Sequence, residues 1–277
     1  AYAIHELNAA IIKAEAGNWG PDDAQHAWDE GWAFYHGPDD SGADFDGCGP
    51  YATADKRAGN FGTDNADGTA AANVATLAAM NAGLTAMQNE DMQGLVDARD
   101  EVLKDIVIVY SQASVRYASK MTDDLATGDA DDYDKHQAEG HAFFRVIEAY
   151  VADHTDACYN NQTHGMAYIG ASAAATCDAF TWTQYQGQGD YMCYNTVVHM
   201  VYAEATTEEI CNGFASMFPG SGMPGYYADY GASQIVNIFD LSDDGDATAD
   251  YEAHVRMYLQ PAWDAFGITS DDIGALV

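Results

Sequence analysis

The residues best suited to chemistry in this chain are histidines and carboxylates that recur in two copies of one short motif. The first copy is His26-Ala27-Trp28-Asp29-Glu30-Gly31-Trp32-Ala33-Phe34-Tyr35, and the second is His136-Gln137-Ala138-Glu139-Gly140-His141-Ala142-Phe143-Phe144. Each copy places a histidine and a carboxylate about one helical turn apart among apolar and aromatic residues. A carboxylate in such surroundings is costly unless it is paired or bound to something. The repeat therefore predicts a metal or anion site between the halves of a duplicated fold.

The predicted metal ligands come from both copies and from the helix between them: Glu30, Glu139, His26, His136, Asp29 and Tyr117. Histidine and glutamate share a helix face at spacings of three or four residues, which both copies have. Tyr117 lies on the apolar stripe of the intervening helix and could supply a phenolate oxygen. Carboxylate and phenolate oxygens, with an occasional imidazole, match a hard cation such as ferric iron.

Each predicted ligand also has a purely structural interpretation. The histidines could be solvated or capping residues, and Tyr117 could be a core tyrosine with a satisfied hydroxyl. The two glutamates could pair with Arg116 or Lys56 instead of a metal ion.

Two arginines, Arg116 and Arg57, are the candidate anion ligands. A guanidinium group can hold a carbonate through two parallel hydrogen bonds. Arg116 is about 100° from Tyr117 around a helix, so we expect only one of the two to face the site. Lys56 and Arg57 could instead fix a long loop in place.

A second candidate metal site lies in an acidic loop. Its possible calcium ligands are Asp240, Ser242, Asp244 and Asp246, which follow the first positions of an EF-hand loop. The twelfth position is Tyr251 rather than the bidentate glutamate, although Glu252 is adjacent. An ordinary Asp/Gly-rich loop is the alternative.

The charge balance restricts the partners. The chain has 44 acidic and 10 basic residues, a net charge of -34. Nucleic acids and anionic membrane surfaces are bound through Lys and Arg, so neither is an expected partner. No apolar run approaches the length of a membrane span. The motifs of nucleophilic catalysis, nucleotide binding and zinc proteolysis are absent from the sequence, so we do not expect an enzyme.

The cysteines indicate an oxidising compartment. Four of the five lie between Cys158 and Cys211, and we expect them to form two disulfides, with Cys48 left over or paired elsewhere. Asn161-Gln162-Thr163 is a glycosylation sequon in the same region. With Ala1 compatible with a processed amino terminus, we expect a secreted, periplasmic or cell-surface protein.

Apolar periodicity predicts a mostly helical chain. Helices are expected over residues 4–16, 22–35, 69–89, 92–122, 131–154 and 250–265. The stretch 38–68 is rich in Gly, Asp and Pro and is expected to be a long ordered loop. Residues 155–232, rich in Cys, Tyr and Gly, are expected to be an insertion of short helices and disulfide-bridged loops.

Four segments resemble the low-iron-inducible periplasmic proteins of algae, a family that includes the phytotransferrins. They are Asp29-Glu30-Gly31-Trp32-Ala33-Phe34-Tyr35, Lys56-Arg57-Ala58-Gly59-Asn60-Phe61-Gly62-Thr63, Ala138-Glu139-Gly140-His141-Ala142-Phe143-Phe144 and Gly267-Ile268-Thr269-Ser270-Asp271-Asp272-Ile273-Gly274. They occur in the family's order and span most of residues 1–154 and 233–277. Residues 155–232 match nothing in the family, and Phe266 and Ser270 replace cysteines expected beside the last segment.

The resemblance implies an all-α fold similar to the imelysin-like proteins, whose two helical bundles pack as pseudo-repeats. Residues 1–154 and 233–277 would form this domain, and residues 155–232 a disulfide-containing insertion. The implied function is extracellular binding of ferric iron together with carbonate for iron acquisition at an algal cell surface, where a receptor could be a partner. The alternative is a self-assembling subunit of a surface layer or filament that uses the same helical scaffold.

Overall fold

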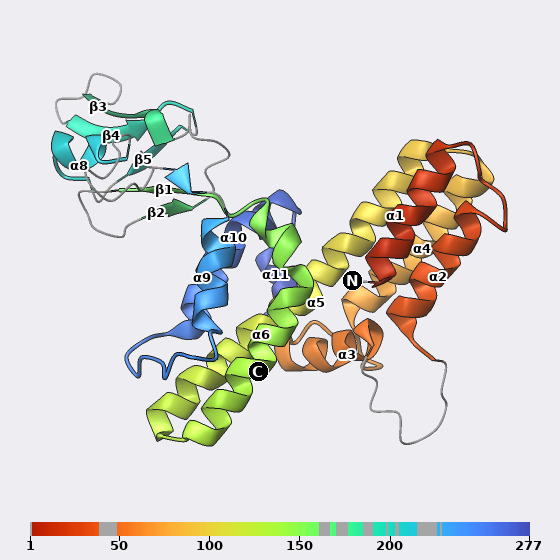
Figure 1. The fold of residues 1–277 in the computed structure, drawn as a ribbon, viewed down its shortest axis with the longest axis horizontal. Helices are drawn as coiled ribbons and strands as arrows, with labels where there is room; N and C mark the ends of the chain where they lie inside the picture. Colours follow the sequence, from red (N-terminus) through yellow and green to blue (C-terminus); the bar gives the residue numbers. More distant parts are fainter. Residues whose placement is uncertain are drawn as a thin grey trace.

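One long helix organises the molecule. The computed structural model describes residues 2–38, 49–160, 167–169, 177–184, 191–197, 199–202, 205–214, 226–227 and 229–277. The fold is mostly helical, as the sequence predicts, and α5 (Met92–Thr127) crosses it diagonally in Figure 1 with other helices along both halves. The Asp91 side chain accepts a hydrogen bond from the Gly94 amide at its start, and Gly128 ends it in the left-handed conformation.

Four helices surround the amino-terminal half of α5: α1 (Tyr2–Glu15), α2 (Ala24–His36), α3 (Pro50–Phe61) and α4 (Ala71–Gln88). Helices α1, α3 and α4 contact α5 directly, and α2 packs on α1, α3 and α4. Trp28 is buried between α2 and α4, where its indole Nε1 donates to the Met80 carbonyl at 2.9 Å. The apolar face of α2 thereby holds this helix against α4.

Helix α3 corrects the expectation of a long loop over residues 38–68. Pro50 occupies its first turn and Gly62 ends it in the left-handed conformation, which are ordinary helix boundaries. Its three alanines and one glycine give it a weak apolar signal, but Ala54, Ala58 and Phe61 are buried against the core. Residues 39–48 of that stretch, with Cys48, lie outside the described residues.

The carboxyl-terminal half of α5 carries a second group of helices: α6 (Ala130–Ala152), α9 (Tyr230–Ile238), α10 (Tyr251–Ala265) and α11 (Ser270–Ile273). Helices α6, α10 and α11 contact α5, and α9 packs on α6 and α10. Trp263 of α10 is buried, and its Nε1 donates to the Ser111 hydroxyl at 2.9 Å. In the described part of the chain no helix is both long enough and apolar enough to cross a bilayer.

The chain's last residues hold α3 against α5. Gln112 of α5 donates to the Ile273 carbonyl at 2.9 Å and to the Thr63 hydroxyl at 3.0 Å. Just beyond, the Ala275 amide donates to the Phe61 carbonyl at 3.2 Å and the Val277 amide to the Asn60 carbonyl. Figure 1 accordingly marks the carboxyl terminus beside α3.

The region between α6 and α9 contains β-structure that the sequence analysis did not predict. One three-stranded sheet has the order β2-β1-β6 and the other β3-β4-β5, all antiparallel. The elements are β1 (Ala157–Tyr159), β2 (Ala167–Ile169), β3 (Phe180–Gln184), β4 (Tyr191–Asn195), β5 (Met200–Tyr202), α8 (Glu208–Asn212) and β6 (Tyr226–Tyr227). This part lies apart from the helices in Figure 1.

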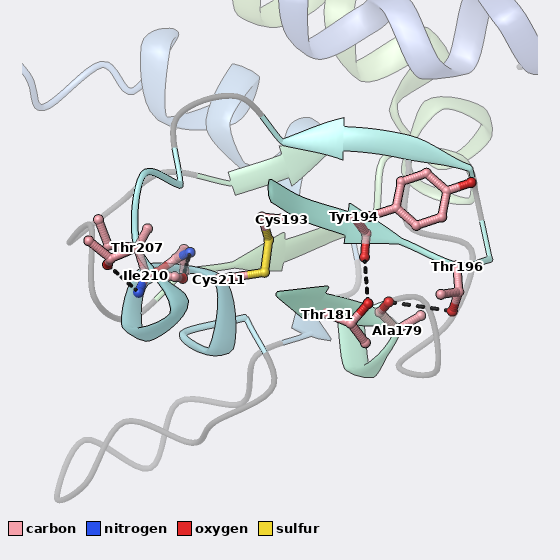
Figure 2. Close-up of a disulfide and its surroundings, with 9 residues drawn as sticks. Ala179, Thr181, Cys193, Tyr194, Thr196, Thr207, Ile210 and Cys211 are labelled. Atoms are coloured by element: carbon pink, nitrogen blue, oxygen red, sulfur yellow. Dashed lines mark hydrogen bonds between the residues drawn. A yellow bond between two sulfur atoms is a disulfide. The ribbon is translucent and has the colours of Figure 1, made fainter. Parts of the chain in front are cut away.

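The expectation of two disulfides in this region is confirmed. Cys158 bonds to Cys177, and Cys193 bonds to Cys211. Figure 2 shows the second bond joining β4 to α8, where the Thr207 side chain caps the helix by accepting from the Ile210 amide at 3.2 Å. All four cysteines are buried with Phe180 and Phe214 in a small core of their own. The sequon at residues 161–163 lies outside the described residues.

The glycines of the repeated motif allow close helix packing. A Cβ atom added to Gly140 of α6 would lie 2.2 Å from the Phe239 ring, and one added to Gly31 of α2 would lie 2.6 Å from the Leu7 side chain. Both glycines are buried. Part of the repeat is therefore a packing signature, independent of its acids and histidines.

This packing predicts the effect of adding one methyl group. Gly140→Ala should lower the free energy of unfolding by about 1–3 kcal/mol, because the rigid Phe239 ring cannot move aside freely. Gly59→Ala is the control: this exposed helical glycine has nothing within 4 Å of the added atom, and alanine should stabilise α3 by up to about 1 kcal/mol. Urea denaturation measures both, and equal effects of the two substitutions would contradict the packing interpretation.

Candidate functional site

Helices α3, α5 and α6 bring positive charge together around one tyrosine. The Cζ atoms of Arg57 and Arg116 lie 5.8 Å and 5.6 Å from the centroid of the Tyr117 ring. The His136 ring centroid is 5.9 Å from that of Tyr117, and the Lys120 Nζ atom is 3.3 Å from His136 Nε2. We call Arg57, Arg116, Tyr117, Lys120 and His136 the Tyr117 cluster. It holds three of the chain's ten lysines and arginines.

Arg57 is the least satisfied member of the cluster. Its side chain is buried, with 8% of the residue exposed, and its Nε and Nη1 atoms have no hydrogen-bond partner among the described residues. Buried guanidinium nitrogens without partners are destabilising, because their lost hydration is not replaced. Burial and the like charge of Arg116 lower the pKa of Arg57, while Tyr117 and Glu139 oppose that shift.

Arg116 lies beside Tyr117 instead of on a separate face. Its guanidinium reaches over the ring from the adjacent position on α5, so both residues reach one site, contrary to the expectation that only one would. In the described part of the chain neither arginine, nor Lys120, has a carboxylate within 4.0 Å. Such a group of cations is matched to an anion.

His136 is held by two hydrogen bonds. Its Nδ1 atom lies 2.6 Å from Asp124 Oδ2, and its Nε2 atom faces the Lys120 ammonium. Because an ammonium group can only donate, Nε2 accepts and Nδ1 carries the proton given to Asp124. His136 could bind a metal ion through Nε2 only if its hydrogen bond with Lys120 were broken. The sequence analysis did not identify Lys120 or Asp124, which lie on α5 one and two turns beyond Tyr117.

Glu139 lies close enough to Arg57 for its charge to raise the pKa of that arginine. Tyr117 also stacks on Phe143 of α6, with ring centroids 5.5 Å apart. The predicted residues Arg57, Arg116, Tyr117, His136 and Glu139 are thus brought to one place.

The first copy of the motif lies elsewhere. On α2, His26 Nε2 is 3.5 Å from Glu30 Oε1, and their side chains are 61% and 45% exposed. Asp29 is also exposed. Helix α2 packs on α1, α3 and α4, whereas α6 packs on α5, α9 and α10, and Figure 1 shows the two helices in different parts of the molecule. The structure therefore does not bring Glu30 together with Glu139.

The carboxylates of the acidic loop after α9 accept hydrogen bonds from other residues of the same loop. Asp240 Oδ1 accepts from the amide and hydroxyl of Ser242, and Asp246 Oδ1 accepts from the amide and hydroxyl of Thr248. Gln137 of α6 donates to the Asp240 carbonyl at 2.8 Å and anchors the loop. Across the described residues, no group of three or more His, Cys, Asp or Glu side chains could hold a metal ion, and this includes Asp240, Asp244 and Asp246.

A second polar site, which the sequence analysis missed, surrounds Asp105. This residue is 2% exposed and its Oδ2 atom lies 2.9 Å from the Thr76 hydroxyl. Thr76 lies 3.4 Å from the Tyr35 hydroxyl, which donates to Asn73 Oδ1 at 2.8 Å. Burial raises the pKa of Asp105 to about 7. The sequence held one sign of this site: Asp105 is an acid at a core position of the otherwise largely apolar run Val102–Val109.

A protonated Asp105 completes this chain of hydrogen bonds. The carboxyl hydrogen can go to Thr76, the Thr76 hydrogen to Tyr35, and the Tyr35 hydrogen to Asn73. When Asp105 is ionised, Thr76 must donate its one hydroxyl hydrogen to the carboxylate. It can then no longer donate to the Tyr35 oxygen. Burial favours the neutral acid, and it outweighs the hydrogen bond that Thr76 donates to the carboxylate, which favours the ionised form.

Comparison of the chain with protein-family models, with curated proteins and with solved structures gave no match. The assignment of function therefore depends on the two sites themselves.

The raised pKa of Asp105 predicts a pH-dependent stability. Its folded value of about 7 exceeds the ordinary value of 3.8, so the folded state holds this proton more tightly and loses stability as pH rises from about 4 to 7. Asp105→Asn removes the ionisation and should raise the free energy of unfolding at about pH 8 by up to about 4 kcal/mol. It should have little effect at about pH 5. Thermal and urea unfolding at both pH values measure this, with the exposed Asp123→Asn on the same helix as control. Parallel pH profiles for wild type and Asp105→Asn would contradict the assignment.

Proposed function

We propose that the protein binds ferric iron together with carbonate at the Tyr117 cluster. The observation that carries this proposal is the buried Arg57 guanidinium, whose Nε and Nη1 atoms have no partner in the described part of the structure. A planar oxyanion would supply two acceptors to such a group and replace its lost hydration. Arg116 and Lys120 add positive charge from α5.

The iron would bind on the side of the anion that faces Tyr117 and Glu139. A phenolate and a carboxylate are oxygen donors suited to a hard cation. The side chains of the described residues form no complete cage of His, Cys, Asp or Glu, so the carbonate would have to occupy part of the iron's coordination shell. Anion and metal binding would then depend on each other.

The wider proposal follows the resemblance to the algal iron-acquisition family. The two disulfides are compatible with an extracytoplasmic location, where they persist. In this proposal the helices on either side of α5 are pseudo-repeats of an imelysin-like fold, and a cell-surface receptor takes up the loaded protein. The strongly negative surface would also concentrate cations around the protein.

Replacement of Arg57 separates an anion-binding role from a structural one. Arg57→Met should weaken bicarbonate-dependent ferric binding at least about thirtyfold, because it removes a buried charged donor. Without bicarbonate and iron, the same substitution should raise the free energy of unfolding, since an unpaired buried charge is lost. Titration with ferric nitrilotriacetate and bicarbonate, followed by urea unfolding, measures both quantities.

Arg145→Met is the matched control, because Arg145 is exposed on α6 and pairs with Glu148. Tyr117→Phe should abolish the visible absorption band expected of a ferric phenolate. Unchanged ferric binding by Arg57→Met, or destabilisation of its unliganded form, would count against the proposed site.

Iron affinity should fall as pH falls. Protons compete with the metal for carbonate, for the Tyr117 oxygen and for Glu139, so acid weakens the site. Ferric affinity measured with bicarbonate at about pH 8 should exceed that at about pH 5.5 by at least tenfold. Equal affinities would remove carbonate from the proposal.

The second candidate function is a self-assembling surface subunit. The observation that favours it is the exposure of apolar side chains on the β-rich region, with Val197 at 53% and Val201 at 41%. Size-exclusion chromatography of the metal-free protein, with and without reductant, should give large species if this function is correct. A single monomeric peak under both conditions would exclude it.

A further inference from the structure

The cavity beside Asp105 has no role in the proposed iron site. Asp105 precedes Tyr117 by twelve positions on α5, which places the two roughly 18 Å apart along the helix. The cavity is about 240 Å³ and lies between α3, α4, α5 and α11. We call it the Asp105 pocket. Its volume is below the range of about 300–1,000 Å³ typical of drug-sized ligands, so its occupant must be small.

The walls of the Asp105 pocket combine apolar and acidic surface. Alanines of α3 and α4 form much of the lining, including Ala58, Ala72 and Ala75. Asp105 lines the cavity from α5, and Asp272 lines it from α11. Two segments of the sequence that the iron site leaves mostly unused, 56–63 and 267–274, thus meet here.

The charge of the pocket is negative. Four carboxylates and one ammonium group line it: Glu101, Asp105, Asp271, Asp272 and Lys104. The Lys104 Nζ atom lies 3.5 Å from Glu101 Oε1, so it pairs at the rim. Burial raises the pKa of Asp272, but hydrogen bonds from Thr269 outweigh it and lower the pKa overall, which keeps this acid ionised.

Asp105 has no cationic partner. In the described residues no Lys, Arg or His side chain lies within 4.0 Å of its carboxyl oxygens, although only 2% of the residue is exposed. A buried carboxylate needs a counter-ion or a proton. A cation that enters the cavity could be this counter-ion.

We propose that the Asp105 pocket binds a small aliphatic ammonium ion, with its charged nitrogen at Asp105 and its alkyl chain against the alanine wall. A bare metal ion would gain nothing from that wall, and no group of three or more His, Cys, Asp or Glu among the described residues suits one. An alkyl chain gains about 0.8 kcal/mol for each methylene that it buries. A second ammonium group at the far end would meet Glu101 or Asp272 at the rim.

Binding of the cation and of a proton should exclude each other. Several groups act on Asp105 from the helices packed around it, namely Tyr35 on α2, Asp55 on α3 through Asn73, Thr76 on α4, Glu101 and Lys104 on α5, and Asp271 and Asp272 on α11. The acids disfavour a further negative charge at Asp105, so the empty pocket favours the proton. Ammonium binding must therefore release that proton below about pH 7.

Calorimetric titration of the full chain with 1,4-diaminobutane tests the proposal. In about 0.15 M salt, which screens the protein's general charge, binding should be measurable at about pH 8 and about tenfold weaker at about pH 6. Repeating the titration in two buffers of different ionisation enthalpy should show proton release at the lower pH. The uncharged isostere 1,4-butanediol should not bind.

Two variants address the site directly. Asp105→Asn should reduce the affinity at pH 8 at least thirtyfold, and Ala72→Leu should do the same by filling the cavity while leaving Asp105 in place. Asp123→Asn removes the same charge from an exposed position of α5 and should bind like wild type. Absent binding in wild type at pH 8, equal binding by Asp105→Asn, or equal affinity at the two pH values would each overturn the proposal. No iron or bicarbonate is present, so failure here is independent of the iron site.

Discussion

Between Val102 and Ala118 the helix α5 contacts protein on nearly every side, so each polar side chain in that stretch must find its partner inside the fold. Ser111 accepts from Trp263, and Gln112 donates to Ile273 and Thr63. These bonds fix α10, α11 and the end of α3 at defined positions along α5. The helices around α5 are therefore positioned by specific hydrogen bonds as well as by apolar burial.

Two buried ionisable groups have no oppositely charged side chain within 4.0 Å among the described residues. Arg57 faces α5 near Tyr117 with unpaired nitrogens, and Asp105 faces a cavity from the other half of the same helix. One is basic and the other acidic, and they lie too far apart to neutralise each other. Tyr117 and the charge of Glu139 act on Arg57, but its Nε and Nη1 atoms have no hydrogen-bond partner among the described residues. Both groups are consistent with sites completed by a ligand.

Much of the helical framework could be predicted from the sequence. A long apolar stripe at helical spacing, as in α5, indicates a helix more reliably than short local signals do. The two disulfides followed from clustered cysteines. Helix α3 was missed because its neighbours are rich in Gly and Asp, although Pro50 and Gly62 mark its ends. The short strands between α6 and α9 were missed because β1, β2 and β5 have only three residues each, too few for an alternating pattern.

The site was predicted only in part, for a physical reason. The repeated motif pointed to α6, where His136 and Glu139 lie near Tyr117 and Arg57. The burial of an acid, however, depends on which helices pack around it, and that is a tertiary property. Glu30 occupies the same motif position as Glu139 yet is half exposed beside His26. The motif positions share their glycine, which serves close packing at both copies. The two copies are thus alike in packing and differ in where they place their ionisable groups.

The contact between the last residues and α3 has a consequence for how the molecule is made. Ala275 and Val277 bond to backbone carbonyls of α3, and Gln112 joins Ile273 across a sequence separation of 161 residues. Such distant pairings form late, since the chain between them must be closed first. During synthesis the contacts that hold the end of α3 can form only after residues 273–277 have left the ribosome. The placement of Arg57 on α3 therefore depends on a segment that the ribosome makes long after α3 itself.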